Sequence, residues 1–291
     1  MSIGYANEGD GDVSVGYATR KAGGVGAELV LLGRATGAEW VKLWSVRSTW
    51  WCLAGAAALM VLGALTLGAG EATELARAGA GEAVVTAADP VVSASALVQF
   101  ALVAMATLVI TSEYASRGIW GTLQAVPVRG RVLAAKALVV APVTAVAGVL
   151  SGAAATAVVS AVLSAGVFRA RVVLPPAEVA LDLLRVGVFF ALVSVMAIGV
   201  GAAVRSAAGA LSVVFMLLMG VPMILLMTGA PVALEASLRM PLFAGLAFMD
   251  SADNITGGPI PYPPGEGLAW LLAWTAAALV AGHAVLRRRD A

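Results

Sequence analysis

The stretch from Thr111 to Lys136, TSEYASRGIWGTLQAVPVRGRVLAAK, decides how the rest of the sequence is interpreted. It is a charged segment, punctuated by Gly and Pro, between two runs that contain no charged residue, Val91 to Ser112 and Ala137 to Phe168. About 20 apolar residues match the hydrocarbon core of a bilayer, so these runs predict two membrane-spanning helices. The segment between them, residues 111–136, must then lie in water on one side, and we call it the charged island.

The charges of the island indicate which side of the membrane this is. It contains one acid that precedes the turn-rich part, Glu113, and four basic residues, Arg117, Arg129, Arg131 and Lys136. Short loops rich in Lys and Arg remain in the cytoplasm during membrane insertion. We therefore expect the island in the cytoplasm, where a soluble partner can bind it. The alternative is a solvated loop whose charges only fix the topology.

The composition is that of an integral membrane protein. The chain has 291 residues, of which 60% are hydrophobic, and a mean hydropathy of +0.94. Soluble domains contain roughly 45 to 50% apolar residues. The single Cys, Cys52, excludes an internal disulfide framework. The formal net charge of +1 lacks the basic excess of nucleic-acid-binding proteins, so we expect no nucleic acid among the partners.

The pattern of apolar runs predicts an all-α, polytopic membrane protein with six transmembrane helices. The expected spans are residues 50–70, 91–112, 137–168, 186–204, 207–228 and 268–286, within one transmembrane domain that covers residues 38–291. The third span exceeds the bilayer thickness and must tilt, protrude or break, with Pro142 and the Gly148–Gly152 contact face as candidate positions. With both termini in the cytoplasm, most of the 18 Lys and Arg residues lie inside.

The N-terminal part predicts a tail and an interfacial helix. Residues 1–37 are rich in Gly and poor in large apolar side chains, so we expect a disordered cytoplasmic tail. The following stretch, EWVKLWSVRS, places four residues at the i, i+3, i+4 and i+7 positions of a helix: Trp40, Leu43, Trp44 and Arg47. Trp favours the headgroup level, which predicts an amphipathic helix in the cytoplasmic interface; a cytoplasmic extension of the first span is the alternative.

A short apolar segment lies before the last span. Leu238 to Met249, LRMPLFAGLAFM, is too short to cross a bilayer. It predicts a piece that is either re-entrant from the outside or interfacial.

The sequence lacks three common motifs of nucleotide-binding, hydrolase and metal sites. There is no Gly-Lys dipeptide and so no Walker A loop, no GxSxG elbow, and only one His, His283, so no HExxH pair. The central parts of the predicted spans contain no Asp, Glu, Lys or Arg. Ion-driven transporters and channels normally place charged groups or exposed carbonyls there. These features favour a permease that is driven by a separate ATPase.

The same residues resemble a known family. The Trp-bearing segment from Glu39 to Trp51, the charged island, and the Arg-Arg-Arg-Asp-Ala ending are similar to those of the type-2 (ABC-2 type) ABC transporter permeases, especially their high-GC Gram-positive branch. The resemblance covers about Glu39 to Ala291. It implies that the Trp-bearing segment lies on the inner leaflet. It also implies that the island contains a coupling helix, which sits in a cleft of a nucleotide-binding subunit.

The resemblance implies a function and a set of site residues. The ATPase-coupling residues would be Glu113, Tyr114, Arg117, Gly118, Leu123 and Pro127. This chain would hold no catalytic residue and no cofactor, since ATP and Mg would be bound by the ATPase partner. A second permease copy, or a homologous permease, would complete a dimer that exports a substrate across the plasma membrane. The residues leave two alternatives open, an intramembrane enzyme and a non-transporting anchor or sensor.

Overall fold

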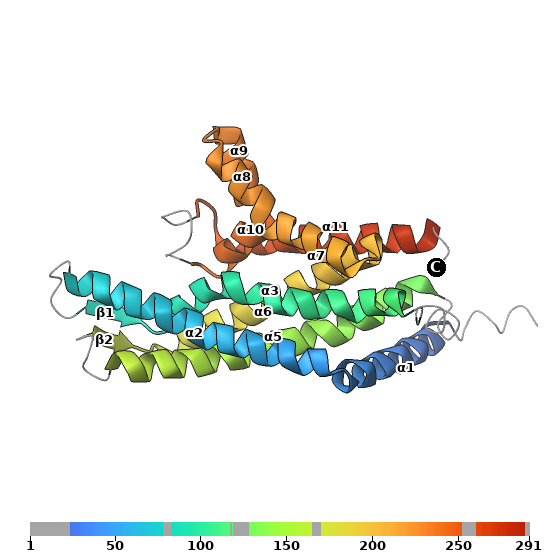
Figure 1. Cartoon of the computed structure of the whole chain (residues 1–291), viewed down its shortest axis with the longest axis horizontal. Helices are drawn as coiled ribbons and strands as arrows, with labels where there is room; N and C mark the ends of the chain where they lie inside the picture. The colour runs from blue at the N-terminus through green and yellow to red at the C-terminus, as the bar shows by residue number, and fades with distance from the viewer. Residues whose placement is uncertain are drawn as a thin grey trace, which may run out of the picture.

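The computed structural model describes residues 24–77, 83–116, 118, 128–164, 170–251 and 260–288. Figure 1 shows an elongated bundle in which the long helices run side by side. In chain order the helices are α1 (Gly24–Ser45), α2 (Arg47–Arg77), α3 (Asp89–Ala115), α5 (Arg129–Ser164), α6 (Pro176–Val204), α7 (Ala207–Phe215), the π-helix η1 (Met216–Gly220), α8 (Val221–Met227), α9 (Pro231–Leu238), α10 (Pro241–Phe248) and α11 (Pro264–Arg288).

Six helices in this described part of the chain are long and apolar enough to cross a membrane. They are α2, α3, α5, α6, the continuous run of α7, η1 and α8, and α11. Each coincides with one predicted span, so the prediction of six apolar helices long enough to cross a membrane is confirmed. The structure adds one feature that was not predicted, a parallel pair of four-residue strands, β1 (Ala83–Thr86) and β2 (Ala170–Val173).

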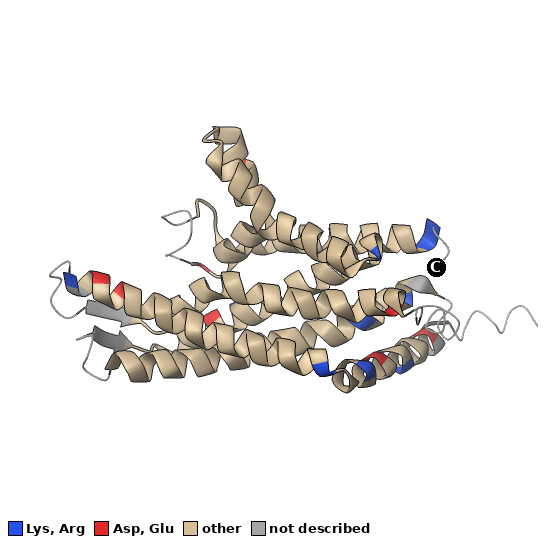
Figure 2. Cartoon of the chain, in the orientation of Figure 1, with Lys and Arg blue, Asp and Glu red and all other residues tan. Residues whose placement is uncertain are grey.

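The two ends of the bundle contain different secondary-structure elements. Figure 1 shows α1, the beginning of α5 and the end of α11 at one end, and the strands β1 and β2 at the other. Figure 2 shows that charged residues gather near the two ends and are absent from the middle of the long helices that it draws. The segments that were predicted to share one side of the membrane therefore lie at the same end, which we call the α1 end. Its placement in the cytoplasm stays a prediction.

The third span does not break. Helix α5 is continuous over 36 residues with Pro142 inside it, which gives a length of about 54 Å at 1.5 Å per residue. Figure 1 shows α2 and α5 extending further than α3 toward the strands. The pair Gly148 and Gly152 faces α6, because a Cβ on these two residues would lie 2.7 Å from Phe190 and 2.7 Å from Leu183. The expected contact face of α5 is thus used within this chain.

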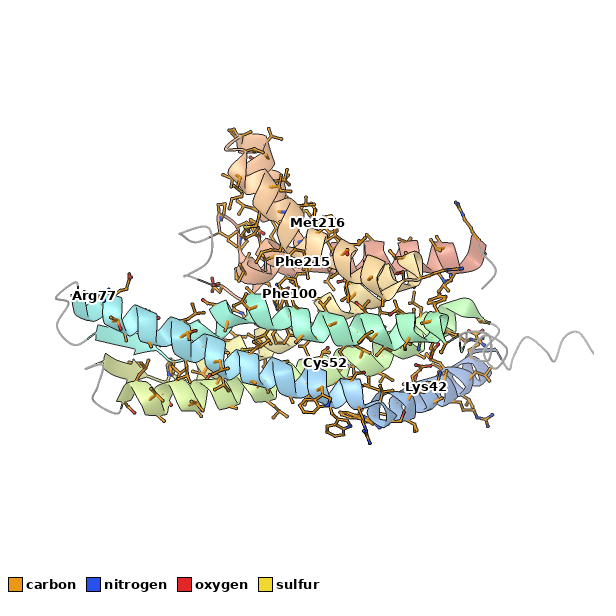
Figure 3. The ribbon with its side chains drawn as sticks, in the orientation of Figure 1. Lys42, Cys52, Arg77, Phe100, Phe215 and Met216 are labelled. Atoms are coloured by element: carbon orange, nitrogen blue, oxygen red, sulfur yellow. The ribbon has the colours of Figure 1, made fainter. Side chains whose placement is uncertain are left out.

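Helix α6 lies at the centre of the bundle and packs closely against α11. A Cβ on Gly199 would lie 2.5 Å from the backbone of Ala278, and one on Gly282 would lie 2.5 Å from the carbonyl of Gly199. No side chain fits at such distances, so the two backbones approach each other directly at these glycines. On another face, α3 meets the fifth span where the rings of Phe100 and Phe215 have centroids 5.4 Å apart (Figure 3).

The segment before the last span forms two short helices. Helices α9 and α10 are bent by 66° relative to each other, and each has eight residues. Nearly all residues of α10 are buried, including Leu242 and Phe243. The apolar stretch Leu238 to Met249 is therefore packed into the bundle, while Figure 1 shows α8 and α9 projecting away from it.

Helix α1 begins earlier than the sequence predicted. It starts at Gly24, so residues 24–37 are helical rather than part of a disordered tail; residues 1–23 lie outside the described residues. Ala, Leu, Glu and Arg are strong helix formers and make up much of this part. A tertiary contact also fixes it, since Nη2 of Arg131 on α5 lies 2.6 Å from Oε1 of Glu28.

Candidate functional site: a buried charge quartet

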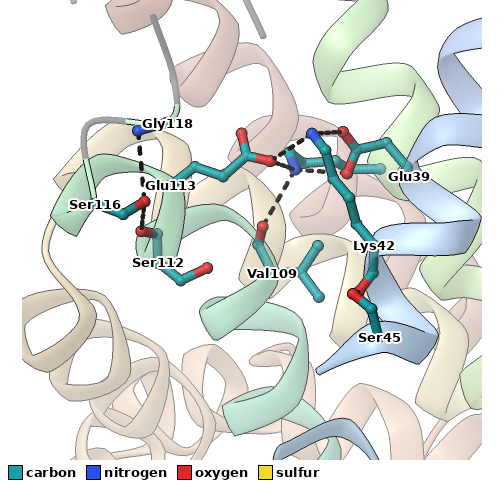
Figure 4. Close-up of polar contacts among 9 residues, drawn as sticks. Glu39, Lys42, Ser45, Val109, Ser112, Glu113, Ser116 and Gly118 are labelled. Atoms are coloured by element: carbon teal, nitrogen blue, oxygen red, sulfur yellow. Dashed lines mark hydrogen bonds and ion pairs between the residues drawn. The ribbon is translucent and has the colours of Figure 1, made fainter. Parts of the chain in front are cut away.

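Four charged side chains from three helices meet at the α1 end of the bundle. Glu39 and Lys42 come from α1, Glu113 from the last turns of α3, and Lys136 from the second turn of α5. We call them the charge quartet. Figure 4 shows the side chains of Glu39, Lys42 and Glu113 converging between these helices. Two of them, Glu113 and Lys136, lie at the two ends of the charged island, so the quartet joins both ends of the island to α1.

Lys136 is the centre of the quartet. Its side chain is 0% exposed, and its Nζ donates hydrogen bonds to Glu39 Oε2 (2.7 Å), Glu113 Oε1 (2.9 Å) and the carbonyl of Val109 (3.2 Å). An ammonium group has three donors, so these three partners satisfy it completely. A buried Lys needs such partners, because an isolated charge out of water is strongly unfavourable.

Lys42 closes the quartet from the solvent side. Its Nζ donates to Glu39 Oε1 and to Glu113 Oε1, both at 2.9 Å, and its side chain is 47% exposed. Burial by itself would lower the pKa of Lys42. The hydrogen bonds and charges of Glu39 and Glu113 outweigh burial and raise this pKa above its ordinary value. The quartet therefore contains two cations and two anions and is electrically balanced.

The burial of α1 explains how Glu39 reaches the site. Its buried positions are Ala35, Glu39 and Leu43, spaced four residues apart on one face of the helix. Leu43 packs with Val139 and Val143 of α5. The apolar contact of Leu43 thus holds α1 against α5 and carries the carboxylate of Glu39 to Lys136.

A second polar contact links the end of α3 to the α6–α7 turn. The guanidinium of Arg205 lies over the ring of Tyr114, 5.5 Å from its centroid, and its Nη2 donates to the carbonyl of Val285 on α11 (3.4 Å). Arg205 ends α6 with φ 61°, in the left-handed region. The start of α5 also meets α11, since a Cβ on Gly130 would lie 3.0 Å from the ring of His283. The end of α6 and the start of α5 therefore contact α11, and the end of α3 contacts the end of α6.

A cavity of about 370 Å³ adjoins the quartet. Its lining includes the charged side chains of Glu39, Lys42 and Glu113, and apolar residues of α1 and α3 such as Leu43 and Met105. The cavity lies where the charged island continues beyond the end of α3, because Gly118 also lines it.

The structure describes three of the six predicted coupling residues. Glu113 belongs to the quartet, and Tyr114 contacts Arg205. Gly118 follows the end of α3, where its N–H donates to Oγ of Ser116 (3.4 Å). The three remaining predicted residues, Arg117, Leu123 and Pro127, lie outside the described residues. Their role in coupling stays a prediction.

The predicted interfacial face needs a correction. Trp40, Leu43 and Trp44 lie on α1 as expected, with Trp40 exposed and Leu43 buried. Helix α1 ends at Ser45, however, and Arg47 begins α2. The i+7 position therefore falls on a different helix, and the buried face of α1 is the one that carries Glu39. A period read over two turns did not distinguish these two faces.

Sequence reasoning did not single out Glu39, Lys42, Lys136 or Arg205 as site residues. A signal for one pair was present. Glu113 directly follows the charge-free run of α3, and Lys136 directly precedes that of α5. Two opposite charges at the same depth of neighbouring spans indicate a pair. Among the described residues, no group of three His, Cys, Asp or Glu side chains is placed to hold a metal ion.

Comparisons with known proteins do not assign the chain to a family. No family model matches the sequence, and no curated protein matches it.

Proposed function

We propose that this chain is the membrane-spanning permease subunit of an ATP-binding cassette exporter of the type-2 class. The charged island would face the cytoplasm and receive the ATPase, which binds ATP and Mg. Two copies of the chain, or this chain and a homologous permease, would form the pathway in the plasma membrane. The resemblance of the sequence to that class and the six apolar spans support this proposal.

The single observation that carries the proposal is the burial of Lys136 between two carboxylates. Its 0% exposed side chain pairs with Glu39 of α1 and Glu113 of α3. A partner that displaces the island would therefore move α1, α3 and α5 together, because separating them would leave a charge buried without a partner. This arrangement suits a bundle that receives mechanical work at the α1 end.

The proposal is tested with the full chain purified from the membrane of its native host under mild detergent. We expect a soluble ATPase to co-purify and to hydrolyse ATP faster with the permease than alone. The double substitution Glu113→Ala with Arg117→Ala should abolish most of this stimulation. The matched control is Glu235→Ala with Arg239→Ala, which removes an exposed ion pair of α9 and should leave it unchanged.

Three results would contradict the proposal. Stimulation that survives in the Glu113→Ala and Arg117→Ala double variant would remove the coupling role of the island. Turnover of a substrate by the purified chain without ATP would favour an intramembrane enzyme. Normal export from cells that lack the chain would favour an anchor or a sensor.

A further inference from the structure

An apolar groove lies between α1, α2 and α5 on the side of α1 away from the quartet cavity. Its volume is about 480 Å³, within the range of roughly 300 to 1,000 Å³ that is typical of ligand sites. Its lining runs from Trp40 and Trp44 on α1 to Pro142, Leu150 and Ala154 on α5, and apart from Ser151 it carries no hydroxyl or charged side chain.

The position of the groove matches the depth of one leaflet. Trp40, Trp44 and Trp50 form a chain of ring contacts, with centroids 5.6 Å and 5.0 Å apart, and Trp marks the headgroup level of a bilayer. From Pro142 to Ala154 the helix rises about 18 Å at 1.5 Å per residue. Half of the hydrocarbon core is about 15 Å. The groove therefore extends from the headgroups to about the middle of the bilayer.

The shape of the groove follows from side-chain size. Ala57 of α2 and Ala147 of α5 are small residues in its lining, whereas Val146 and Leu150 are large, 55% and 64% exposed. Small residues between large ones produce a channel along the helices instead of a flat surface. A flat helix face is covered by many exchanging lipids, but a groove holds one chain in contact on several sides.

A positive charge lies at the junction of α1 and α2, three residues after Trp44 of the groove lining. Arg47 begins α2 between Trp44 and Trp50, and its side chain is exposed. Arg near the headgroup level attracts the phosphate of anionic lipids. The apolar groove and the cation at the α1–α2 junction match the two parts of such a lipid.

We propose that the groove binds one acyl chain of an anionic phospholipid from the leaflet in which α1 lies, with the lipid phosphate beside Arg47. The chain packs between the Trp residues of α1 and the exposed side of α5. It thereby adds to the attachment of α1, to which Leu43, the charge quartet, the pair of Glu28 with Arg131 and the contact of Trp44 with Trp50 also contribute. The site is independent of the proposed transport function.

The test uses the full chain in phosphatidylcholine nanodiscs that contain a small fraction of phosphatidylglycerol with a diazirine in the middle of one acyl chain. After illumination, the labelled residues are located by peptide mass spectrometry. We expect the label to concentrate on α5 between Val143 and Ala154. Ala147→Trp fills the channel and should lower this labelling about tenfold, the change expected for the loss of a few buried methylene contacts. Val280→Trp, on an exposed position of α11, should leave it unchanged.

A second variant from another helix, Ala57→Leu, narrows the same channel and should also lower the labelling. Both groove variants are accepted only if they elute as the wild type does in gel filtration. The site would be overturned if α5 were labelled no more than the exposed face of α11. It would also be overturned if both folded groove variants left the labelling of α5 unchanged. Equal labelling by a phosphatidylcholine probe, or by the anionic probe in Arg47→Gln, would overturn the headgroup assignment. No ATPase is used, so failure here leaves the transport proposal standing.

Discussion

Replacing Lys136 by Met removes the centre of the charge quartet while keeping the apolar stem of the side chain. The substitution leaves Glu39 and Glu113 with Lys42 as their common partner, and Lys42 is half exposed. Both carboxylates are largely buried, with side chains 6% and 14% exposed. The variant therefore holds one excess negative charge in a site that excludes most water.

The expected loss of stability is large. Removing one partner of a buried ion pair costs about 3–5 kcal/mol, because the remaining charges lose a close opposite charge in a site that excludes most water. A change of 1 kcal/mol shifts the melting temperature of a chain of this size by roughly 2–4 °C, which predicts a decrease on the order of 10 °C. Lys42→Met should be milder, on the order of 1 kcal/mol, because that side chain is half exposed and its pair is screened by water.

Thermal unfolding in detergent, followed by fluorescence of the Trp residues, measures these differences. Arg239→Met is the control, since it removes an exposed pair with Glu235 and should change stability by less than about 1 kcal/mol. The double variant Lys136→Met with Glu39→Gln restores the charge balance and should recover most of the loss. If Lys136→Met unfolds at the wild-type temperature, the quartet does not hold the three helices together.

Three further predictions follow from other parts of the structure. Gly199→Ala should destabilise the protein by about 1–3 kcal/mol, because its Cβ would meet the backbone of α11; Gly55→Ala, with nothing within 4 Å, should be neutral or slightly stabilising in the same melting assay. Burial, with Glu266 nearby, raises the pKa of Tyr262 to about 12. Its contribution to stability should be fully present below the ordinary phenol pKa of about 10 and be lost as the pH rises through 12. Melting curves against pH should lose this dependence in Tyr262→Phe. If the charged island faces the cytoplasm, Gly118→Cys in a Cys52→Ser background should react with an impermeant maleimide only after cells are opened. Labelling of intact cells would show that the island faces the outside.

The spans were predictable because they depend only on the length of the charge-free apolar runs along the sequence. A run without charges that is long enough to cross the hydrocarbon core must be a helix there, whatever its neighbours are. The six predicted runs each became one helix or one continuous series of helices. The length of α5 allowed it to tilt, protrude or break, and its sequence did not show which; the structure shows that it does not break.

The quartet was not predictable in the same way, because it depends on which face of α1 meets α5. Glu39 and Trp40 are adjacent in sequence, and a helix can bury one or the other. Leu43 docks on α5 and selects the face that carries Glu39. Glu39 could be buried there only because Lys136 of α5 lies at the same level, 97 positions away in the chain. Neither residue alone indicates the pair.

The quartet constrains motion more than it explains stability. Apolar residues of similar volume often stabilise a protein as well as a buried ion pair does, so the energy of the quartet is a weak reason for its presence. Its geometry has a stronger consequence. Each carboxylate accepts from both Lys42 and Lys136, so sliding any one of the three helices breaks at least two charged hydrogen bonds at once. Lys136 is too buried to replace them with water. We therefore expect α1, α3 and α5 to move together, and in the proposed permease the charged island, anchored at both ends in the quartet, would drive this displacement.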